Sequence, residues 1–154
     1  MSDHSARISW HFTGEEFLKG YSREHTWTFD GGQTVPASAA PANVPVPFSN
    51  PAGVDPEEAF VAAISSCHML TFLWLCFQQK FEVVSYVDDA VGSMSKNEHG
   101  VLWVSHVVLR PAVLYGASAP NLNQEEHLHH LAHEQCFIAN SVKTDIKVST
   151  PLTR

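Results

Sequence analysis

The stretch DPEEAFVAAISSCHMLTFLWLCFQQK, residues 55–80, decides the fold because it predicts one long helix with an apolar centre. Asp55 is a favourable N-cap, Pro56 suits the first helical turn, and two glutamates follow where the helix dipole favours negative charge. Residues 59–77 contain no Asp, Glu, Lys or Arg. A helix that is apolar on all sides is typical of the centre of a core, so we expect the remaining chain to pack around it.

The same apolar run is just long enough to raise the alternative of a membrane span. Polar residues interrupt it, however, and no second run of this kind follows; the interrupting residues are Ser65, Ser66, His68 and Thr71. Residues 1–7 also lack the charged-then-apolar pattern of a secretory signal. We therefore expect a cytoplasmic protein with a buried helix and no membrane partner.

Alternating apolar and polar residues predict strands on both sides of this helix. The predicted strands cover residues 6–12, 25–30, 83–94, 101–113 and 145–149. Residues 97–100, Asn-Glu-His-Gly, predict a hairpin turn. Residues 34–54 contain five prolines, which exclude a helix and a central strand, so an extended surface segment is expected there.

A second helix is predicted from Asn123, its expected N-cap, to about Cys136, and residues 138–142 show no clear preference. The resulting order is strands, long helix, strands, helix and strand, without regular alternation. This order predicts an α+β fold, and we expect a single domain over residues 1–154.

Composition narrows the possible partners. The chain has 154 residues, of which 44% are hydrophobic and 16% charged, and its formal net charge is −7. The negative charge argues against a nucleic-acid partner. The small share of charged residues indicates that much of the surface is buried, and a second subunit would bury it.

The three cysteines are too few for a secreted disulfide framework, which again favours an intracellular protein. Cys67 and Cys76 are nine positions apart and therefore point to opposite faces of the predicted helix at about 100° per residue. They cannot share one site on that helix. We interpret Cys76 as a small buried hydrophobic residue.

Cys67 could be either an inert or a reactive residue. The inert interpretation is the commoner one, because most buried cysteines only fill space in the core. Burial suppresses the thiolate, so a reactive Cys67 requires a nearby cation. The candidates are His68 on the same helix or an arginine. Arg23 lies in the loop of residues 20–25, from which it can reach over a site, although a solvated surface charge is the commoner role.

Two motifs resemble the OsmC/Ohr family. The run Asp-Pro-Glu-Glu-Ala-Phe-Val-Ala-Ala-Ile-Ser-Ser-Cys-His-Met-Leu, residues 55–70, resembles the cysteine helix of that family. The run Ala-His-Glu-Gln-Cys-Phe-Ile-Ala-Asn-Ser-Val-Lys, residues 132–143, is similar to its second motif, with Phe137 where many relatives have proline. The two motifs stand in family order and at about family spacing, and the predicted strands fit around them.

The resemblance implies an OsmC-like fold, with antiparallel sheets around a long buried central helix in an intertwined homodimer. It also implies a thiol peroxidase for organic hydroperoxides, with Cys67 as the peroxidatic thiolate and Cys136 as the resolving thiol. Glu57 matches the motif glutamate, and Arg23 is the best match for the assisting arginine. The implied reductant is a dithiol, of the lipoyl type in many relatives, and no cofactor is implied.

Helix geometry constrains this site. Glu57 and Cys67 are ten residues apart, so about 15 Å of rise separates them in one straight helix. Either the helix breaks between them, or the Glu57 and Cys67 of one site come from different subunits. The second option agrees with the low charge content and predicts sites at a homodimer interface.

Two rival functions remain open. The second predicted helix carries His127, His129, His130 and His133, and a zinc or copper site could use His129 with His133 or His133 with Cys136. A solvated helix face is the commoner explanation. The other rival is a non-enzymatic dimer in which Cys67 belongs to the core. His25 and His68 are further residues that could line a pocket.

Overall fold

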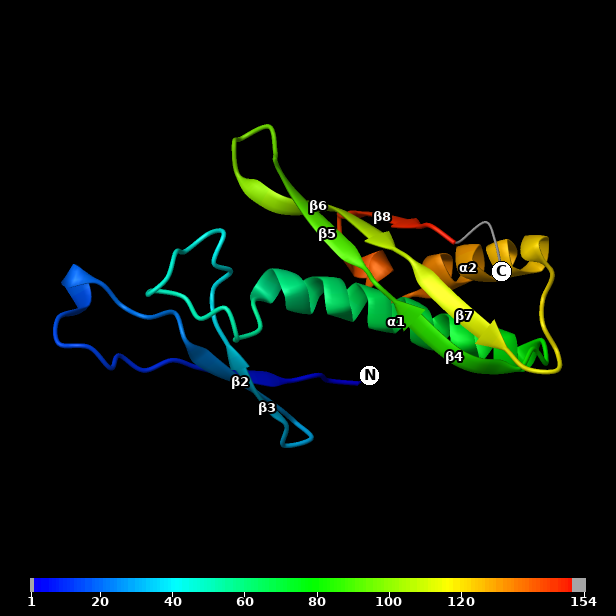
Figure 1. Ribbon diagram of the computed structural model, residues 1–154, viewed down its shortest axis with the longest axis horizontal. Coiled ribbons are helices and arrows are strands. Elements are labelled where there is room, and N and C mark those ends of the chain that lie inside the picture. The colour runs from blue at the N-terminus through cyan, green and yellow to red at the C-terminus, as the bar shows by residue number, and fades with distance from the viewer. Residues whose placement is uncertain (1, 151–154) are drawn as a thin grey trace. The chain divides into compact units, whose positions relative to one another are not determined.

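The computed structural model describes residues 2–150, and the chain divides into two compact units, Met1–Ala59 and Phe60–Arg154 (Figure 1). The expectation of one domain over residues 1–154 stays a prediction.

The N-terminal unit is built on a three-stranded antiparallel sheet in the order β1-β2-β3. Its strands are β1 (Ala6–Ser9), β2 (His25–Phe29) and β3 (Thr34–Ala37), and the short 3-10 helix η1 (Phe17–Lys19) lies in the long β1–β2 connection. The first two strands confirm the prediction. β3 was not predicted, because Pro36 lies inside it; a proline is tolerated there since β3 is an edge strand.

Helix α1 (Pro56–Gln78) confirms the predicted long helix and its N-cap. The Asp55 carboxylate accepts a hydrogen bond from the Glu58 backbone N–H at 2.7 Å, and the Glu58 carboxylate accepts from the Asp55 N–H at 3.2 Å. This reciprocal pair is a capping box. The helix is continuous through Glu57 and Cys67, so the first of the two options, a break between them, is wrong.

The C-terminal unit contains two further sheets. β4 (Val83–Asp88) pairs with β7 (Pro111–Tyr115), while β5 (Val91–Lys96), β6 (Leu102–Leu109) and β8 (Asp145–Val148) form the second sheet. The predicted strands 83–94 and 101–113 are therefore each two strands in different sheets. β8 pairs with β6 in parallel, so the expectation of purely antiparallel sheets is wrong for this pair.

One carboxylate fixes the place where the strands change sheets. Asp88 accepts hydrogen bonds from the Arg110 backbone N–H at 2.6 Å and from the Ser65 hydroxyl of α1. Both strand breaks, after Asp88 and at Arg110, thus meet at one side chain. The residues at the β5–β6 turn confirm the predicted hairpin, in which the Asn97 side chain accepts from the N–H groups of His99 and Val101.

Helix α2 (Leu122–Gln135) confirms the second helix but begins earlier than predicted. Its N-cap is Asn121, whose side chain forms a capping box with Gln124, and not Asn123. Each asparagine is followed three residues later by Gln or Glu, so the pattern alone does not separate them. The ambiguous residues 138–142 contain a second 3-10 helix, η2 (Ala139–Ser141).

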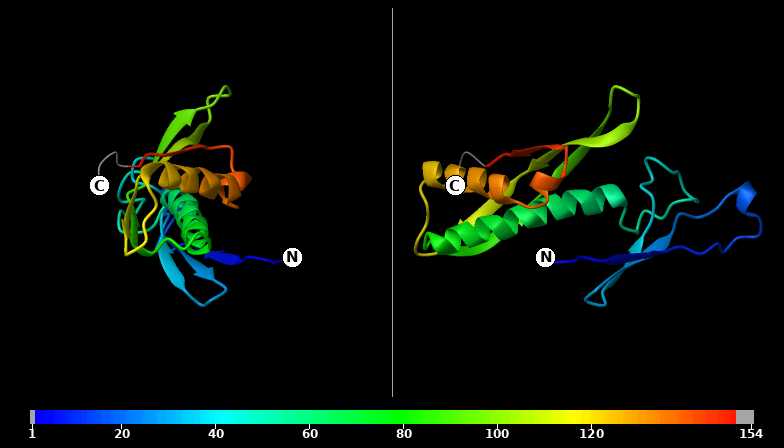
Figure 2. Two further views of the ribbon diagram at one scale, coloured as in Figure 1. Left: turned by 90° about the vertical axis from the view of Figure 1, so that its right-hand side faces the viewer. Right: turned by 180° about the vertical axis from the view of Figure 1, so that it is seen from behind.

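The core of the C-terminal unit lies where α1, α2 and the strands meet (Figure 2). One cluster joins the two helices through Phe72, Leu75, Cys76, Leu128 and Ala132. The other joins α1 to β6 through Ile64, Val107 and Leu109. Cys76 is 1% exposed, as the interpretation of a buried hydrophobic residue requires.

Only part of α1 is buried within a single chain. Of its most apolar segment 28% is buried, and Leu70, Trp74 and Phe77 are 61%, 54% and 72% exposed. Among the described residues α1 is the one helix long and apolar enough to cross a membrane, but a core helix of a soluble protein has the same composition. The prediction that α1 is buried on all sides is therefore not met within a single chain.

Replacing Phe72 by alanine should lower the free energy of unfolding by about 3–5 kcal/mol, because the side chain is fully buried between the helices. Urea denaturation at one fixed protein concentration measures the change. Phe137→Ala is the matched control, since Phe137 is 83% exposed and should change stability by less than about 0.5 kcal/mol. Equal losses in the two variants would contradict this description of the core.

Candidate functional site

The structure brings two of the predicted site residues together. Cys67 is half-buried on α1, and Cys136 is 1% exposed at the C-terminal end of α2. Burial raises the pKa of the Cys136 thiol to about 11, and a side-chain hydrogen bond with Cys67 is the second cause of the rise. Neither cysteine forms a disulfide. Two thiols in direct contact, one of them firmly protonated, can interconvert with a disulfide.

The turn after Cys136 is closed by hydrogen bonds to the end of α2. The Asn140 side chain donates to the carbonyl oxygens of Glu134 at 2.8 Å and Cys136 at 2.9 Å, and the Ser141 hydroxyl donates to the Phe137 carbonyl at 2.7 Å. The Ala139 N–H donates to Cys136 Sγ at 3.4 Å. These contacts satisfy carbonyl groups that a helix end leaves free and hold the thiol in place.

His68 does not supply the cation that a reactive Cys67 needs. It is 1% exposed, and burial together with the nearby His133 lowers its pKa to about 4, against a smaller opposing effect of Asp88. Its Nε2 lies 3.1 Å from Nδ1 of His129, and the two rings are nearly parallel. The hypothesis of a cationic His68 is therefore wrong: at neutral pH His68 is an uncharged core residue.

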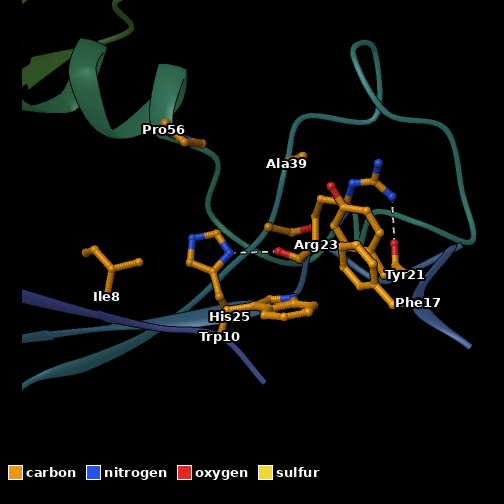
Figure 3. Close-up of a pocket in the computed structure, with 9 residues that line it drawn as sticks. Ile8, Trp10, Phe17, Tyr21, Arg23, His25, Ala39 and Pro56 are labelled. Atoms are coloured by element: carbon orange, nitrogen blue, oxygen red, sulfur yellow. Dashed lines mark hydrogen bonds between the residues drawn. The ribbon is translucent and has the colours of Figure 1, made fainter. Parts of the chain in front are cut away.

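The N-terminal unit holds an apolar pocket of about 420 Å³ (Figure 3). Its walls are mostly aromatic and aliphatic and come from β1, the β1–β2 connection, β2, the segment after β3 and the first residue of α1. They include Ile8, Trp10, Phe17, Tyr21, Ala39 and Pro56. Arg23 and His25 are the basic residues in this lining, so the pocket suits an apolar molecule with one polar group.

Arg23 is fixed in this pocket by its own loop. Its guanidinium lies over the Tyr21 ring, with 3.8 Å between Cζ and the ring centroid, and Nη1 donates to the Tyr21 carbonyl at 2.6 Å. The Arg23 N–H donates to the Phe48 carbonyl, and Gly20 admits the Phe48 ring where a Cβ would meet it at 2.6 Å. The interpretation of a freely solvated charge does not fit these contacts.

His25 has a positioning role in the same pocket. Its Nε2 accepts a hydrogen bond from the Trp27 indole at 2.9 Å, so the proton of a neutral ring is on Nδ1, which donates to the Arg23 carbonyl at 2.7 Å. The ring thus ties β2 to the arginine loop. The sequence left the role of His25 open, and in the structure His25 lines this apolar pocket.

Glu57 is incompletely paired. Its Oε1 lies 3.4 Å from the Asn43 side-chain nitrogen, while Oε2 is buried without a hydrogen-bond partner. Among residues 2–150 no ion pair joins Glu57 to Arg23, and no carboxylate pairs with Arg23. The N-terminal unit therefore carries a fixed arginine and an unpaired glutamate oxygen, whereas the thiols belong to the C-terminal unit.

The metal alternative finds no ligand set here. Within the described residues no group of three or more His, Cys, Asp or Glu side chains is placed to hold a metal ion. Two members of the histidine group, His129 and His133, turn inward, while His130 is exposed beside Glu134 at 3.3 Å. In the sequence, the i, i+4 spacing of His129 and His133 singled these two residues out. That spacing suggested metal binding, and it did not predict the contact between His68 and His129.

The family profile described as OsmC-like protein matches residues 49–150. This chain belongs to the OsmC-like family. The match covers all three cysteines and Glu57. No curated protein sequence matches the chain.

Solved structures agree with the family assignment. An OsmC-like protein of unknown function from Vibrio cholerae O1 biovar eltor is 55% identical, with a TM-score of 0.95 over 98% of this chain and 100% of that one. An organic hydroperoxide resistance protein OsmC from Legionella pneumophila has a TM-score of 0.74 at 17% identity, covering 99% and 98% of the two chains. One from Elizabethkingia anophelis has 0.72 at 16% identity, covering 97% and 94%. The two distant likenesses establish the fold alone.

Alkylation should distinguish the three thiols of the OsmC-like chain. At pH 8 iodoacetamide should label Cys67 first, because Cys136 and Cys76 are buried and both have a pKa raised to about 11. Only about one in a thousand of either thiol is ionised at that pH, and its labelling should rise about tenfold per pH unit. Peptide mass spectrometry over time measures the three rates. Faster labelling of Cys136 than of Cys67 would contradict this order.

Proposed function

We propose that this protein is a cysteine-based peroxidase that reduces organic hydroperoxides. The observation that carries the proposal is the contact between the Cys67 and Cys136 thiols at the meeting point of the two helices. Cys67 is the more accessible of the pair and takes the peroxidatic role, while the buried Cys136 takes the resolving role. The family and its hydroperoxide-resistance relatives point to peroxide-related redox chemistry in the same way.

The reaction proceeds in three balanced steps. The Cys67 thiolate attacks the outer peroxide oxygen, the O–O bond breaks, and the alkoxide takes up a proton to leave as an alcohol. Cys67 becomes a sulfenic acid. Cys136 then attacks the Cys67 sulfur and water leaves, which gives a disulfide. An external dithiol, of lipoyl type in the expectation from the family, reduces the disulfide by exchange and becomes oxidised itself.

Arg23 and Glu57 assist the first step in this proposal. A guanidinium favours the Cys67 thiolate and stabilises the charge that develops on the leaving oxygen. The Glu57 oxygen that lacks a partner is a ready acceptor for the guanidinium, whose donors have no carboxylate among the described residues. Pairing the two would satisfy both groups and orient the arginine.

The apolar pocket beside Arg23 sets the substrate class. Ring contacts such as the stacked Phe17 and Tyr21, with centroids 4.5 Å apart, give its wall an aromatic character. Such a surface favours a hydroperoxide with a hydrocarbon group over hydrogen peroxide, which is small and polar. The peroxide oxygens would lie toward the arginine.

A homodimer completes the site in this proposal. Leu70, Trp74 and Phe77 share the face of α1 on which Cys67 lies, since their spacing from Cys67 is three, seven and ten residues. All three are more than half exposed within one chain. A second subunit that covers this stripe would also cover Cys67. Because α1 is continuous, Glu57 cannot reach Cys67 of its own helix, so the partner chain supplies Arg23 and Glu57.

A thiol count tests the peroxidase. Cumene hydroperoxide added to the reduced protein should remove two thiols per chain, because Cys67 and Cys136 form a disulfide while Cys76 stays reduced. Titration with a thiol reagent in denaturant measures the loss. Cys67→Ser should lose none, and Cys136→Ser should stop at a sulfenic acid that dimedone traps. A wild-type protein that keeps all three thiols would support the non-enzymatic alternative.

Mixing two inactive variants tests the shared site. Arg23→Ala should slow peroxide reduction by about 100- to 1,000-fold, and Cys67→Ser should abolish it. If the site combines residues of two chains, refolding the variants together should restore about a quarter of wild-type activity, because half of the dimers are mixed and each has one intact site. Arg7→Ala is the matched control and should stay active. No recovery, despite mixed dimers on native mass spectrometry, would show that each site uses one chain.

A further inference from the structure

Arg23 is tied to the sheet of the N-terminal unit through its main chain. The Arg23 carbonyl accepts a hydrogen bond from Nδ1 of His25 at 2.7 Å (Figure 3), and His25 is the first residue of β2. The contacts of Arg23 with Tyr21 stay within the β1–β2 connection and would move with it. The bond to His25 is different, because β2 is the central strand and pairs with both β1 and β3.

Trp27 holds the His25 ring in one state. Its indole Nε1–H can only donate, and it donates to His25 Nε2 at 2.9 Å, whereas the Arg23 carbonyl can only accept. Both bonds exist together only in a neutral ring with its proton on Nδ1. Trp27 follows His25 by two residues in β2, so the two side chains stand on the same face of the strand. The result is a hydrogen-bonded chain from Trp27 through His25 to Arg23.

A reacting arginine needs support of this kind. A charged group stabilises a transition state fully only when it is held in the productive geometry, and a displacement of about 1 Å can cost about 100-fold in rate. Arg23 belongs to a connection with little regular structure, where the main chain is free to shift. The bond from His25 limits that shift at the residue itself, since it holds the carbonyl group next to the Cα atom that carries the side chain.

We propose that Trp27 and His25 are positioning residues for Arg23, and that they hold it only while His25 is uncharged. This inference rests on the proposed peroxidase function, in which Arg23 assists the first step. Trp27 acts on the His25 ring, and His25 acts on the Arg23 carbonyl, so neither residue needs to touch the peroxide. The rate of the first step then depends on the state of His25 as well as on the ionisation of Cys67.

Protonation of His25 breaks the chain at one point. Both nitrogens of an imidazolium carry protons, so Nε2 would meet the indole N–H of Trp27 donor to donor. The ring must turn to separate the two donors. The bond from Nδ1 to the Arg23 carbonyl then either breaks or pulls the carbonyl with it, and in both cases Arg23 leaves the position that the neutral ring gives it.

The pocket offers a charged His25 no acidic neighbour. Among the described residues that line it, Arg23 and Tyr21 are the others with ionisable side chains, and both come from the β1–β2 connection. The remaining elements contribute side chains that do not titrate, namely Ile8 from β1, Ser38 and Ala39 after β3, and Pro56 from α1. The carboxylate of Glu24, next in the chain, accepts a hydrogen bond from the Asn50 side chain at 2.7 Å. An imidazolium would therefore share this lining with the guanidinium alone.

NMR spectroscopy tests the chain without use of activity. In reduced wild-type protein labelled with ¹⁵N-histidine, the neutral His25 ring should carry its proton on Nδ1 at pH 8, because Trp27 donates to Nε2. Comparison with the spectrum of His25→Asn assigns the signals. A neutral ring with its proton on Nε2 would overturn the proposal whatever the kinetics show.

Single-turnover kinetics test the effect on Arg23. In a Cys136→Ser background, dimedone trapping of the Cys67 sulfenic acid measures the first step with cumene hydroperoxide. At pH 8 His25→Phe, which keeps a ring but can make neither bond, should slow this step by about 100-fold. His25→Asn should stay within about fivefold of the parent, because its amide can donate to the Arg23 carbonyl in place of Nδ1. A parent rate in His25→Phe would contradict the positioning role.

His11→Asn is the matched control for these variants. His11 is an exposed histidine of the same connection, so its replacement should leave the first step unchanged at every pH. A loss in His11→Asn equal to that in His25→Phe would assign the effect to the connection as a whole and overturn the specific role of His25.

The pH profile separates this role from a merely structural one. His25→Asn shares the ionisation of Cys67 but cannot titrate at position 25, so the parent rate divided by the His25→Asn rate isolates His25. This ratio should fall at least about fivefold between pH 8 and pH 5, where histidines ordinarily titrate. In Trp27→Phe an imidazolium meets no opposing donor, so the rate of that variant divided by the His25→Asn rate should change by less than about twofold. A parent ratio that stays flat would overturn the proposal.

Two further outcomes are decisive. If His25→Phe does not fold, the tautomer of the wild-type ring and the pH dependence of the His25→Asn ratio still decide the proposal. A wild-type protein that loses no thiols to the hydroperoxide overturns the peroxidase itself, and the positioning role with it. Thiol loss together with a flat ratio overturns only the role of His25 and Trp27 and leaves the peroxidase standing.

Discussion

The structure depends on one constraint: α1 carries no charged side chain over residues 59–77, so its polar groups must find partners within the fold. Each of three polar side chains does so. Ser65 donates to Asp88, His68 bonds to His129, and the Thr71 hydroxyl donates to the Cys67 carbonyl at 2.9 Å. Two of these partners belong to other elements, so the helix fixes where β4 and α2 lie. The same contacts place the end of α2, and with it Cys136, against Cys67.

The long helix could be predicted because its signals are local. An N-cap, a proline in the first turn and an uncharged run all lie within one stretch of sequence, and the structure agrees with each. The strand breaks at Asp88 and Arg110 could not be predicted in this way. The predicted strands run through both positions. The strands break there because Asp88 accepts hydrogen bonds from Arg110 and Ser65, which lie 22 and 23 residues away in the sequence. The parallel pairing of β8 with β6 is equally non-local, since both strands have the alternation of an antiparallel strand.

The candidate site also contains features that local sequence patterns predict and features that they do not. Helical spacing alone separated Cys67 from Cys76, and the structure places Cys76 in the helix–helix core. The meeting of Cys67 with Cys136 came only from the family resemblance, because no local pattern joins residues so far apart. His68 was misjudged since adjacency to Cys67 in sequence suggested a cation, whereas the burial that lowers its pKa depends on α2. The pocket around Arg23 was missed for a similar reason: its aromatic residues lie in a connection with little regular structure.

Phe137 follows the second thiol, and the turn at that thiol does not depend on the Phe137 side chain. A proline after the cysteine would fix φ and end the helix. Here Phe137 is 83% exposed and makes no core contact, so its side chain does not hold the turn. The hydrogen bonds of Asn140 and Ser141 do so instead. Asn140 ties the turn to the carbonyl groups of Glu134 and Cys136 at the end of α2, and Ser141 bonds to the carbonyl of Phe137 within the turn. Position 137 is therefore free of a structural demand on its side chain, and the burial of Cys136 depends on the polar residues that follow it.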